Sequence, residues 1–166
     1  MKNKVLIYWG VGLFTAVSIV AVIWAGLKYG KGVVDKAASS VADTLQNLVY
    51  PIGSYLSQGF SATHNGVDIP TPEGTPLKAS FNGTVYDVNY NDEGGNQLIV
   101  SYPSVNLIVS FSHLTKSVVA KGDAFKKGDI LAYSGNTGYS TGAHVHLTTT
   151  LNGQLVNPAT VFTFAA

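Results

Sequence analysis

The stretch Gln97-Leu-Ile-Val-Ser-Tyr102, followed closely by Asn106-Leu-Ile-Val-Ser-Phe111, decides the fold class. Both are short runs rich in β-branched and aromatic residues, which are typical of strands rather than helices. Three further runs have the same character: Gly83-Thr-Val-Tyr-Asp-Val88, Asp129-Ile-Leu-Ala-Tyr133 and Val145-His-Leu-Thr-Thr-Thr150. Turn-forming segments such as Asn91-Asp-Glu-Gly-Gly95 and Asn136-Thr-Gly138 separate several of the runs. The sequence therefore predicts a mainly β fold, an antiparallel rolled sheet or sandwich, over residues 52–166.

The N-terminal part of the chain has a different character. Residues 1–4 form a short polar N-terminus, and no charged residue occurs from Val5 to Leu27. At 1.5 Å per residue, a helix over 5–27 is long enough to cross a hydrocarbon core of about 30 Å. Aromatic residues near both ends fit the membrane interfaces. The main alternative to a spanning helix is a cleaved signal peptide, but the apolar run here is longer than the apolar part of such a peptide. We therefore predict a transmembrane helix over 5–27 in contact with lipid, whose orientation the flanking lysines do not settle.

A second, shorter pattern follows the apolar run. Apolar residues recur at helical spacing between Val34 and Leu48, with polar residues between them. Pro51 ends this pattern because proline cannot continue a helix. Residues 28–51 are therefore predicted to form a short helical stalk or linker.

Composition limits the functions that the chain can have. The 166 residues allow one domain plus an appendage, and the net charge of +1 comes from lysines without any arginine. Such a chain has no basic stripe for a phosphate backbone, so nucleic acid is not an expected partner. The chain has no cysteine, so a metal site has to use histidine and carboxylate ligands.

All four histidines lie in the β-rich part. His144 and His146 are two residues apart in a predicted strand, so both imidazoles lie on one face. His64 and Asp68 are close enough in sequence to converge on one metal ion, and His113 follows an apolar run. The spacing alone leaves five candidates for about three ligand positions. The alternative is a set of polar side chains on the outer face of a sheet and in a surface turn.

Three blocks of sequence narrow this choice. They are His64-Asn-Gly-Val-Asp68 with Pro72-Glu-Gly-Thr-Pro76 after it, Phe111-Ser-His113-Leu114, and the run from Lys121 through Ser134-Gly-Asn-Thr-Gly138 to Ala143-His-Val-His146. Together they resemble the lysostaphin-like zinc endopeptidases, which cut peptide cross-links in bacterial peptidoglycan. The resemblance covers residues 57–162 and leaves out the apolar run and the stalk.

The resemblance implies a zinc metalloendopeptidase with one Zn²⁺ per chain. It implies that His64, Asp68 and His146 are the metal ligands, and that His113 and His144 are catalytic residues that do not bind the metal. The implied substrate is a peptidoglycan peptide. The enzyme would be a single-pass membrane protein with its peptidase domain on the wall-facing side. In a bacterial virus, the same enzyme would be a lysin of the virion membrane, with assembly partners in a membrane or virion complex.

The chain departs from the family pattern at a few positions, so the resemblance does not assign the shape of the substrate groove. These positions are Phe111, Ala143, Thr148 and Thr149. None of these changes removes a predicted ligand or catalytic histidine. A non-catalytic wall-binding or structural protein of the same fold is the alternative function, and its expected mark is a missing ligand. A biotinyl- or lipoyl-like carrier domain is less consistent with the sequence, because no lysine has the setting of a modified residue at a hairpin tip.

Overall fold

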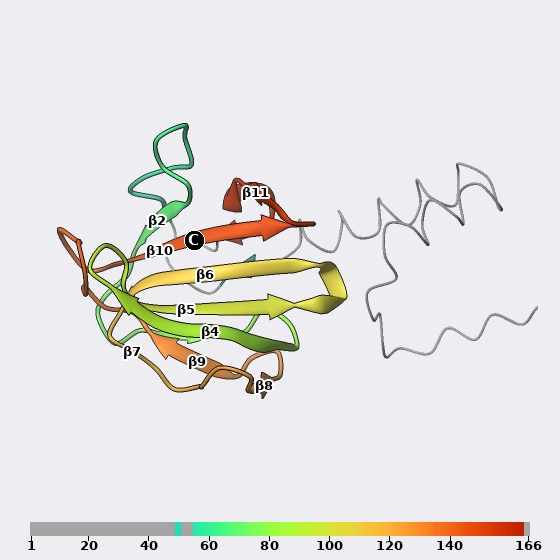
Figure 1. The fold of residues 1–166 in the computed structure, drawn as a ribbon. Helices are drawn as coiled ribbons and strands as arrows, with labels where there is room; N and C mark the ends of the chain where they lie inside the picture. The colour runs from blue at the N-terminus through green and yellow to red at the C-terminus, as the bar shows by residue number, and fades with distance from the viewer. Residues whose placement is uncertain (1–48, 51–54, 165–166) are drawn as a thin grey trace, which may run out of the picture.

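In the computed structural model of the chain, residues 49–50 and 55–164 are described (Figure 1). They form short strands joined by turns, together with two brief 3-10 helices, η1 (Pro103–Val105) and η2 (Pro158–Thr160). The strands are β1 (Val49–Tyr50), β2 (Val67–Pro70), β3 (Pro76–Lys78), β4 (Gly83–Asn91), β5 (Gly95–Tyr102), β6 (Leu107–Leu114), β7 (Lys116–Ser117), β8 (Ala124–Phe125), β9 (Ile130–Tyr133), β10 (His144–Leu151), β11 (Gln154–Val156) and β12 (Thr163–Phe164). The predicted mainly β class is confirmed.

Two antiparallel sheets build the domain. The larger has seven strands in the order β11-β10-β6-β5-β4-β8, and β2 pairs with the first half of β10. The smaller has three strands in the order β3-β9-β7. Figure 1 shows β10, β6, β5 and β4 lying side by side, with β9 and β7 on another layer. A separate parallel pair joins β1 to β12, with Val49 opposite Thr163.

The hydrophobic core lies between the two sheets. Leu98 and Leu147 from the larger sheet and Leu77 and Leu131 from the smaller sheet belong to one buried cluster. Strand β10 shows how the sequence sets this arrangement, because Val145, Leu147 and Thr149 are fully buried whereas the residues between them are only half-buried. The two-residue period of the strand therefore turns its histidines to the opposite face of the sheet, away from the core.

The turn between β4 and β5 borders this open face. The backbone N–H of Gly94 donates to Asn91 Oδ1 (2.6 Å), and Gly95 has a φ of +63° that favours glycine. A side chain at Gly95 would also collide with the backbone of Thr137. The turn is therefore packed tightly against the loop that precedes β10.

The predicted transmembrane helix over 5–27 lies outside the described residues, as does the predicted stalk over 28–51 except for Val49–Tyr50. Among the residues that the structure describes, none forms a helix of sufficient length and apolar character to span a membrane. Val49 and Tyr50, the described end of the predicted stalk, belong to a strand.

Candidate metal centre and groove

Strand pairing brings two of the predicted site residues together. Asp68 of β2 lies directly opposite His146 of β10 in the antiparallel register. Directly opposite residues on one face of a sheet are in side-chain contact. Asp68 Oδ1 lies 2.7 Å from His146 Nδ1. The contact therefore follows from the register of two strands that are far apart in sequence.

A turn before β2 adds the third residue. Ser61 and His64 exchange backbone hydrogen bonds, which closes the turn, and the Nδ1–H of His64 donates to the carbonyl of Gly59 (2.9 Å). A carbonyl only accepts, so the neutral ring of His64 carries its proton on Nδ1 and its lone pair on Nε2. His64 Nε2 lies 3.3 Å from Asp68 Oδ1.

These three side chains can hold a metal ion. His64, Asp68 and His146 each offer one ligand atom, and the three atoms lie within 4.8 Å of one another. Two donors bound to one tetrahedral Zn²⁺ at about 2.1 Å are about 3.4 Å apart, so the observed separations need only small side-chain adjustments. Two imidazoles and a carboxylate are a donor set that zinc accepts, with a position left for water.

Asn65 supports this centre, although the sequence reasoning did not assign it a role. Its Oδ1 lies 3.2 Å from Nε2 of His146. In a metal-bound centre, this acceptor would hold the ring proton on Nε2, while Nδ1, which lies 2.7 Å from Asp68 Oδ1, would face the metal. The signal that could have identified Asn65 is its place in the His64-Asn-Gly-Val-Asp68 block, directly after a predicted ligand.

His113 and His144 form a second pair beside the three ligands. Their ring centroids are 4.6 Å apart, and His144 Nε2 lies 3.8 Å from Asp68 Oδ1. Nδ1 of His113 donates to the carbonyl of Thr137 (2.9 Å), and Nδ1 of His144 donates to that of Gly142 (2.8 Å). In their neutral forms, both rings therefore carry the proton on Nδ1 and a lone pair on Nε2. Such a nitrogen can take up and return a proton.

The setting of His113 favours its neutral form. Burial lowers the pKa of His113, and the nearby His144 and His146 lower it further against the opposing effects of the Thr137 carbonyl and Asp68. The residue also has a φ of +62°, which is uncommon for a residue other than glycine. Its backbone N–H donates to the carbonyl of Gly94 (2.7 Å), so the β4–β5 turn helps to hold this conformation.

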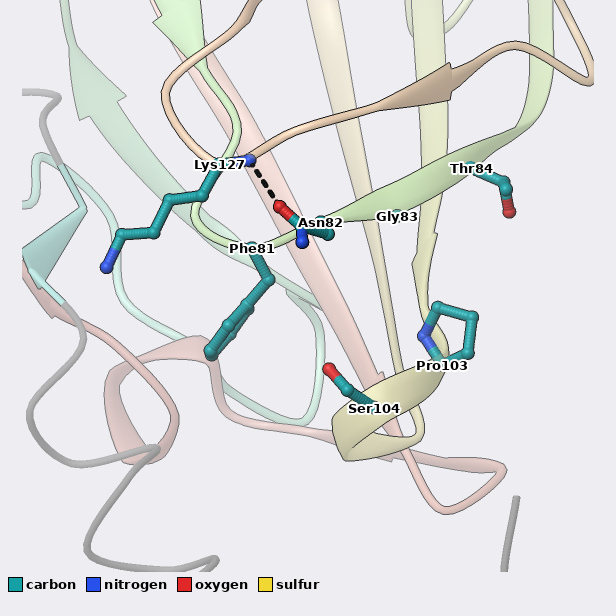
Figure 2. Close-up of a pocket in the computed structure, with 7 residues that line it drawn as sticks. All are labelled: Phe81, Asn82, Gly83, Thr84, Pro103, Ser104 and Lys127. Atoms are coloured by element: carbon teal, nitrogen blue, oxygen red, sulfur yellow. Dashed lines mark hydrogen bonds between the residues drawn. The ribbon is translucent and has the colours of Figure 1, made fainter. Parts of the chain in front are cut away.

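All five predicted site residues therefore lie together, in an open groove of about 1030 Å³. The groove is lined by the 58–65 loop, the β4–β5 turn, the 139–141 segment and the outward faces of β6 and β10. A second cleft, of about 470 Å³, lies at the opposite end of the larger sheet, where β4 begins and β5 ends (Figure 2). Lys127 is its one charged lining residue, and its backbone N–H donates to Asn82 Oδ1 (2.9 Å). This second cleft offers no metal-binding side chains.

The four positions at which the chain departs from the family pattern differ in whether they line the groove. Thr148 lines the groove. Phe111 is 1% exposed and lies opposite Leu147 on the core side of the sheet, and Thr149 is fully buried. The period of two along β6 and β10 turns Phe111 and Thr149 away from the groove. Phe111 and Thr149 therefore do not line the groove, and neither does Ala143.

Comparison with known proteins places the chain in a family. A family model described as peptidase family M23 matches residues 62–158. A peptidoglycan DD-endopeptidase of Vibrio cholerae, ShyC, is 36% identical over 98 residues, which cover 59% of this chain and 22% of that protein. The chain spans between 19% and 26% of the length of the curated relatives it matches.

Several solved structures share the fold, and two of them illustrate the likeness. The crystal structure of a zinc containing peptidase from Vibrio cholerae has a TM-score of 0.61 and 30% identity, and the match covers 66% of this chain and 38% of that one. The catalytic domain of the antimicrobial peptidase lysostaphin from Staphylococcus simulans has a TM-score of 0.55 and 28% identity, with 71% and 92% covered. Together with the donor set, these likenesses support Zn²⁺ as the cofactor. Because the family model covers more than half of the chain and every predicted site residue, the chain belongs to peptidase family M23, as the sequence predicted.

Proposed function

We propose that the chain is a zinc endopeptidase that hydrolyses peptide bonds in bacterial peptidoglycan. The observation that carries this proposal is the arrangement of the groove, in which three ligand atoms lie within 4.8 Å of one another beside two further histidines. The intact ligand set favours catalysis over a non-catalytic wall-binding module. The likeness to proteins named peptidoglycan DD-endopeptidases supports the substrate.

The site residues divide into two groups in this proposal. His64, Asp68 and His146 hold the metal, and Asn65 orients His146. Zn²⁺ in such a site acts as a Lewis acid on a peptide carbonyl and makes water more acidic, toward a pKa of about 7. His113 and His144 do not bind the metal.

His113 and His144 are suited to proton transfer and charge stabilisation. Each has a free Nε2 lone pair, so each can orient water and accept a proton from it. Once protonated, an imidazole can steady the oxygen that gains negative charge, and it can pass the proton to the leaving amine. The lowered pKa of His113 matches the first of these steps because it keeps the ring neutral before the reaction.

The test uses the purified full-length chain in detergent with isolated peptidoglycan. Mass spectrometry of the released muropeptides identifies the bond that is cut. We expect new amino and carboxyl ends in the peptide part, loss of activity with a chelator and recovery with added Zn²⁺. Peptidoglycan that binds the protein but releases no fragments would instead favour the non-catalytic alternative.

We also propose that the apolar run over 5–27 anchors the enzyme in a membrane, with the peptidase domain facing the wall. Two observations support this proposal. The sequence has an apolar run without charged residues over 5–27, and the proposed substrate lies outside the cytoplasmic membrane. A virion membrane of a bacterial virus is the second location to test. A cysteine introduced by Ser39→Cys is expected to react with a membrane-impermeant thiol reagent on intact cells. Labelling only after the membrane is broken would contradict the wall-facing orientation.

A further inference from the structure

The groove contains one carboxylate that the proposed mechanism does not use. Apart from the histidines, its charged lining residues are Asp68 and Glu93. Asp68 is turned to the histidines, with its Oδ1 2.7 Å from His146 and 3.3 Å from His64. Glu93 is exposed and has no ion-pair partner among the described residues. None of the described lysines lines the groove: Lys78, Lys116, Lys121, Lys126 and Lys127.

The backbone beneath Glu93 is held in place. Its carbonyl accepts from the N–H of Tyr139 (2.9 Å), and the next carbonyl, of Gly94, accepts from the N–H of His113 (2.7 Å). Gly138 packs so closely on this turn that a Cβ there would lie 2.9 Å from the Glu93 carbonyl oxygen. Glu93 therefore belongs to a turn whose backbone is held in place and is hydrogen-bonded to the backbone of His113, a predicted catalytic residue.

In the part of the chain that the structure describes, Glu93 has no ion-pair partner and no lysine lines the groove, so its carboxylate attracts a positively charged group and repels a negatively charged one. We propose that Glu93 is a specificity-determining residue, which selects peptides that carry a free ammonium group close to the bond that is cut. This inference rests on the proposed function and defines which peptidoglycan peptides the groove prefers.

A matched pair of substrates isolates this charge. In a cross-linked muropeptide dimer, the diamino acid of the donor stem keeps one amino group free. Acetylation of that amino group removes the positive charge and leaves every other bond of the dimer unchanged. The ratio of kcat/KM for the free dimer to that for the acetylated dimer therefore measures how strongly the groove favours the ammonium group.

We expect the full-length chain to favour the free dimer and Glu93→Gln to lower the ratio about fivefold, the upper range for a solvent-exposed ion pair. The change should lie in KM rather than kcat, because the ammonium group takes no part in the reaction and its contact with Glu93 forms equally in the ground state and the transition state. Glu93→Lys should reverse the preference. Raising the salt concentration should reduce the ratio in the unaltered chain but not in Glu93→Gln.

Asp92→Asn is the matched control, because Asp92 precedes Glu93 in the same turn, is exposed and does not line the groove. It removes the same charge and should leave the ratio unchanged. Equilibrium binding can be measured without turnover in His144→Ala. This variant should bind the free dimer more tightly than the acetylated dimer, and adding Glu93→Gln should reduce that difference. An unchanged ratio in Glu93→Gln, or an equal change in Asp92→Asn, would overturn the role of Glu93 while the proposed function stands. Failure of the unaltered chain to cut either dimer would overturn both.

Discussion

Asp68 and His146 lie directly opposite each other on β2 and β10, and Asp68 Oδ1 is 2.7 Å from His146 Nδ1. The same oxygen lies 3.3 Å from His64 Nε2 and 3.8 Å from His144 Nε2. One carboxylate oxygen is therefore surrounded by three imidazoles. In the proposed centre Asp68 also reduces the net positive charge that two neutral histidines would leave on the metal.

Metal content tests the assignment of the ligands. His146→Ala and His64→Ala are each expected to abolish stoichiometric zinc, because two remaining ligands do not form a stable tetrahedral site. Zinc per chain, measured by elemental analysis after gel filtration, gives the answer. His113→Ala is the matched control and should keep its zinc. Undiminished zinc in His146→Ala would contradict the assignment.

Turnover separates the second pair of histidines from the ligands. His113→Ala and His144→Ala should each lower kcat about 10²–10⁴-fold, the usual contribution of a general acid or base. Zinc content should stay unchanged in both variants. If His144→Ala lost the metal and His146→Ala kept it, the roles of these two histidines would have to be exchanged.

The sequence predicted the long strands well because their patterns are local. The run Gln97–Tyr102 lies within β5, and Val145–Thr150 lies within β10. Strands β7 and β8 have only two residues each, and their pairing with neighbours, rather than a run of strand-forming residues, defines them. The two-residue period also placed His144 and His146 on one face correctly.

The groove itself was less predictable because it depends on contacts between distant segments. The spacing of His64, Asp68 and His113 does not show that β10 lies between β2 and β6, which brings these residues together. The carbonyls of Gly59, Thr137 and Gly142 that orient the rings leave no mark in the sequence, since any residue type supplies a carbonyl. The resemblance to a known family, rather than the spacing, supplied the division of roles.

Asn65 offers a test of the support around the metal. Asn65→Ala removes the acceptor that lies 3.2 Å from His146 Nε2, so the affinity for zinc should fall about 10–100-fold. Competition with a chromogenic chelator measures that affinity. Thr63→Ala, in the same turn, is the matched control, because the Thr63 hydroxyl contacts Ser61 rather than a predicted ligand. Equal zinc affinities in Asn65→Ala and Thr63→Ala would show that Asn65 does not support the metal centre.

Gly66 lies between the predicted ligands His64 and Asp68, and the space around it explains why a glycine is needed. A Cβ added there would lie 2.5 Å from the carbonyl oxygen of Leu147 and 2.8 Å from His146 Nε2. The carbonyl belongs to the backbone of a central strand, so it cannot move aside cheaply. Gly66→Ala should therefore push β2 and the ring of His146 apart, lower the free energy of unfolding by about 1–3 kcal/mol and weaken zinc binding.

Gly59→Ala is the control for this change, because a Cβ there meets nothing within 4 Å and the carbonyl that accepts from His64 is retained. Denaturant unfolding and chelator competition on both variants distinguish a crowded metal centre from a general effect of replacing glycine in this region. If Gly66→Ala bound zinc and unfolded like Gly59→Ala, then the close approach of β2 to the ring of His146 would not be needed for the metal centre. The ligand geometry proposed for His146 would then have to be revised.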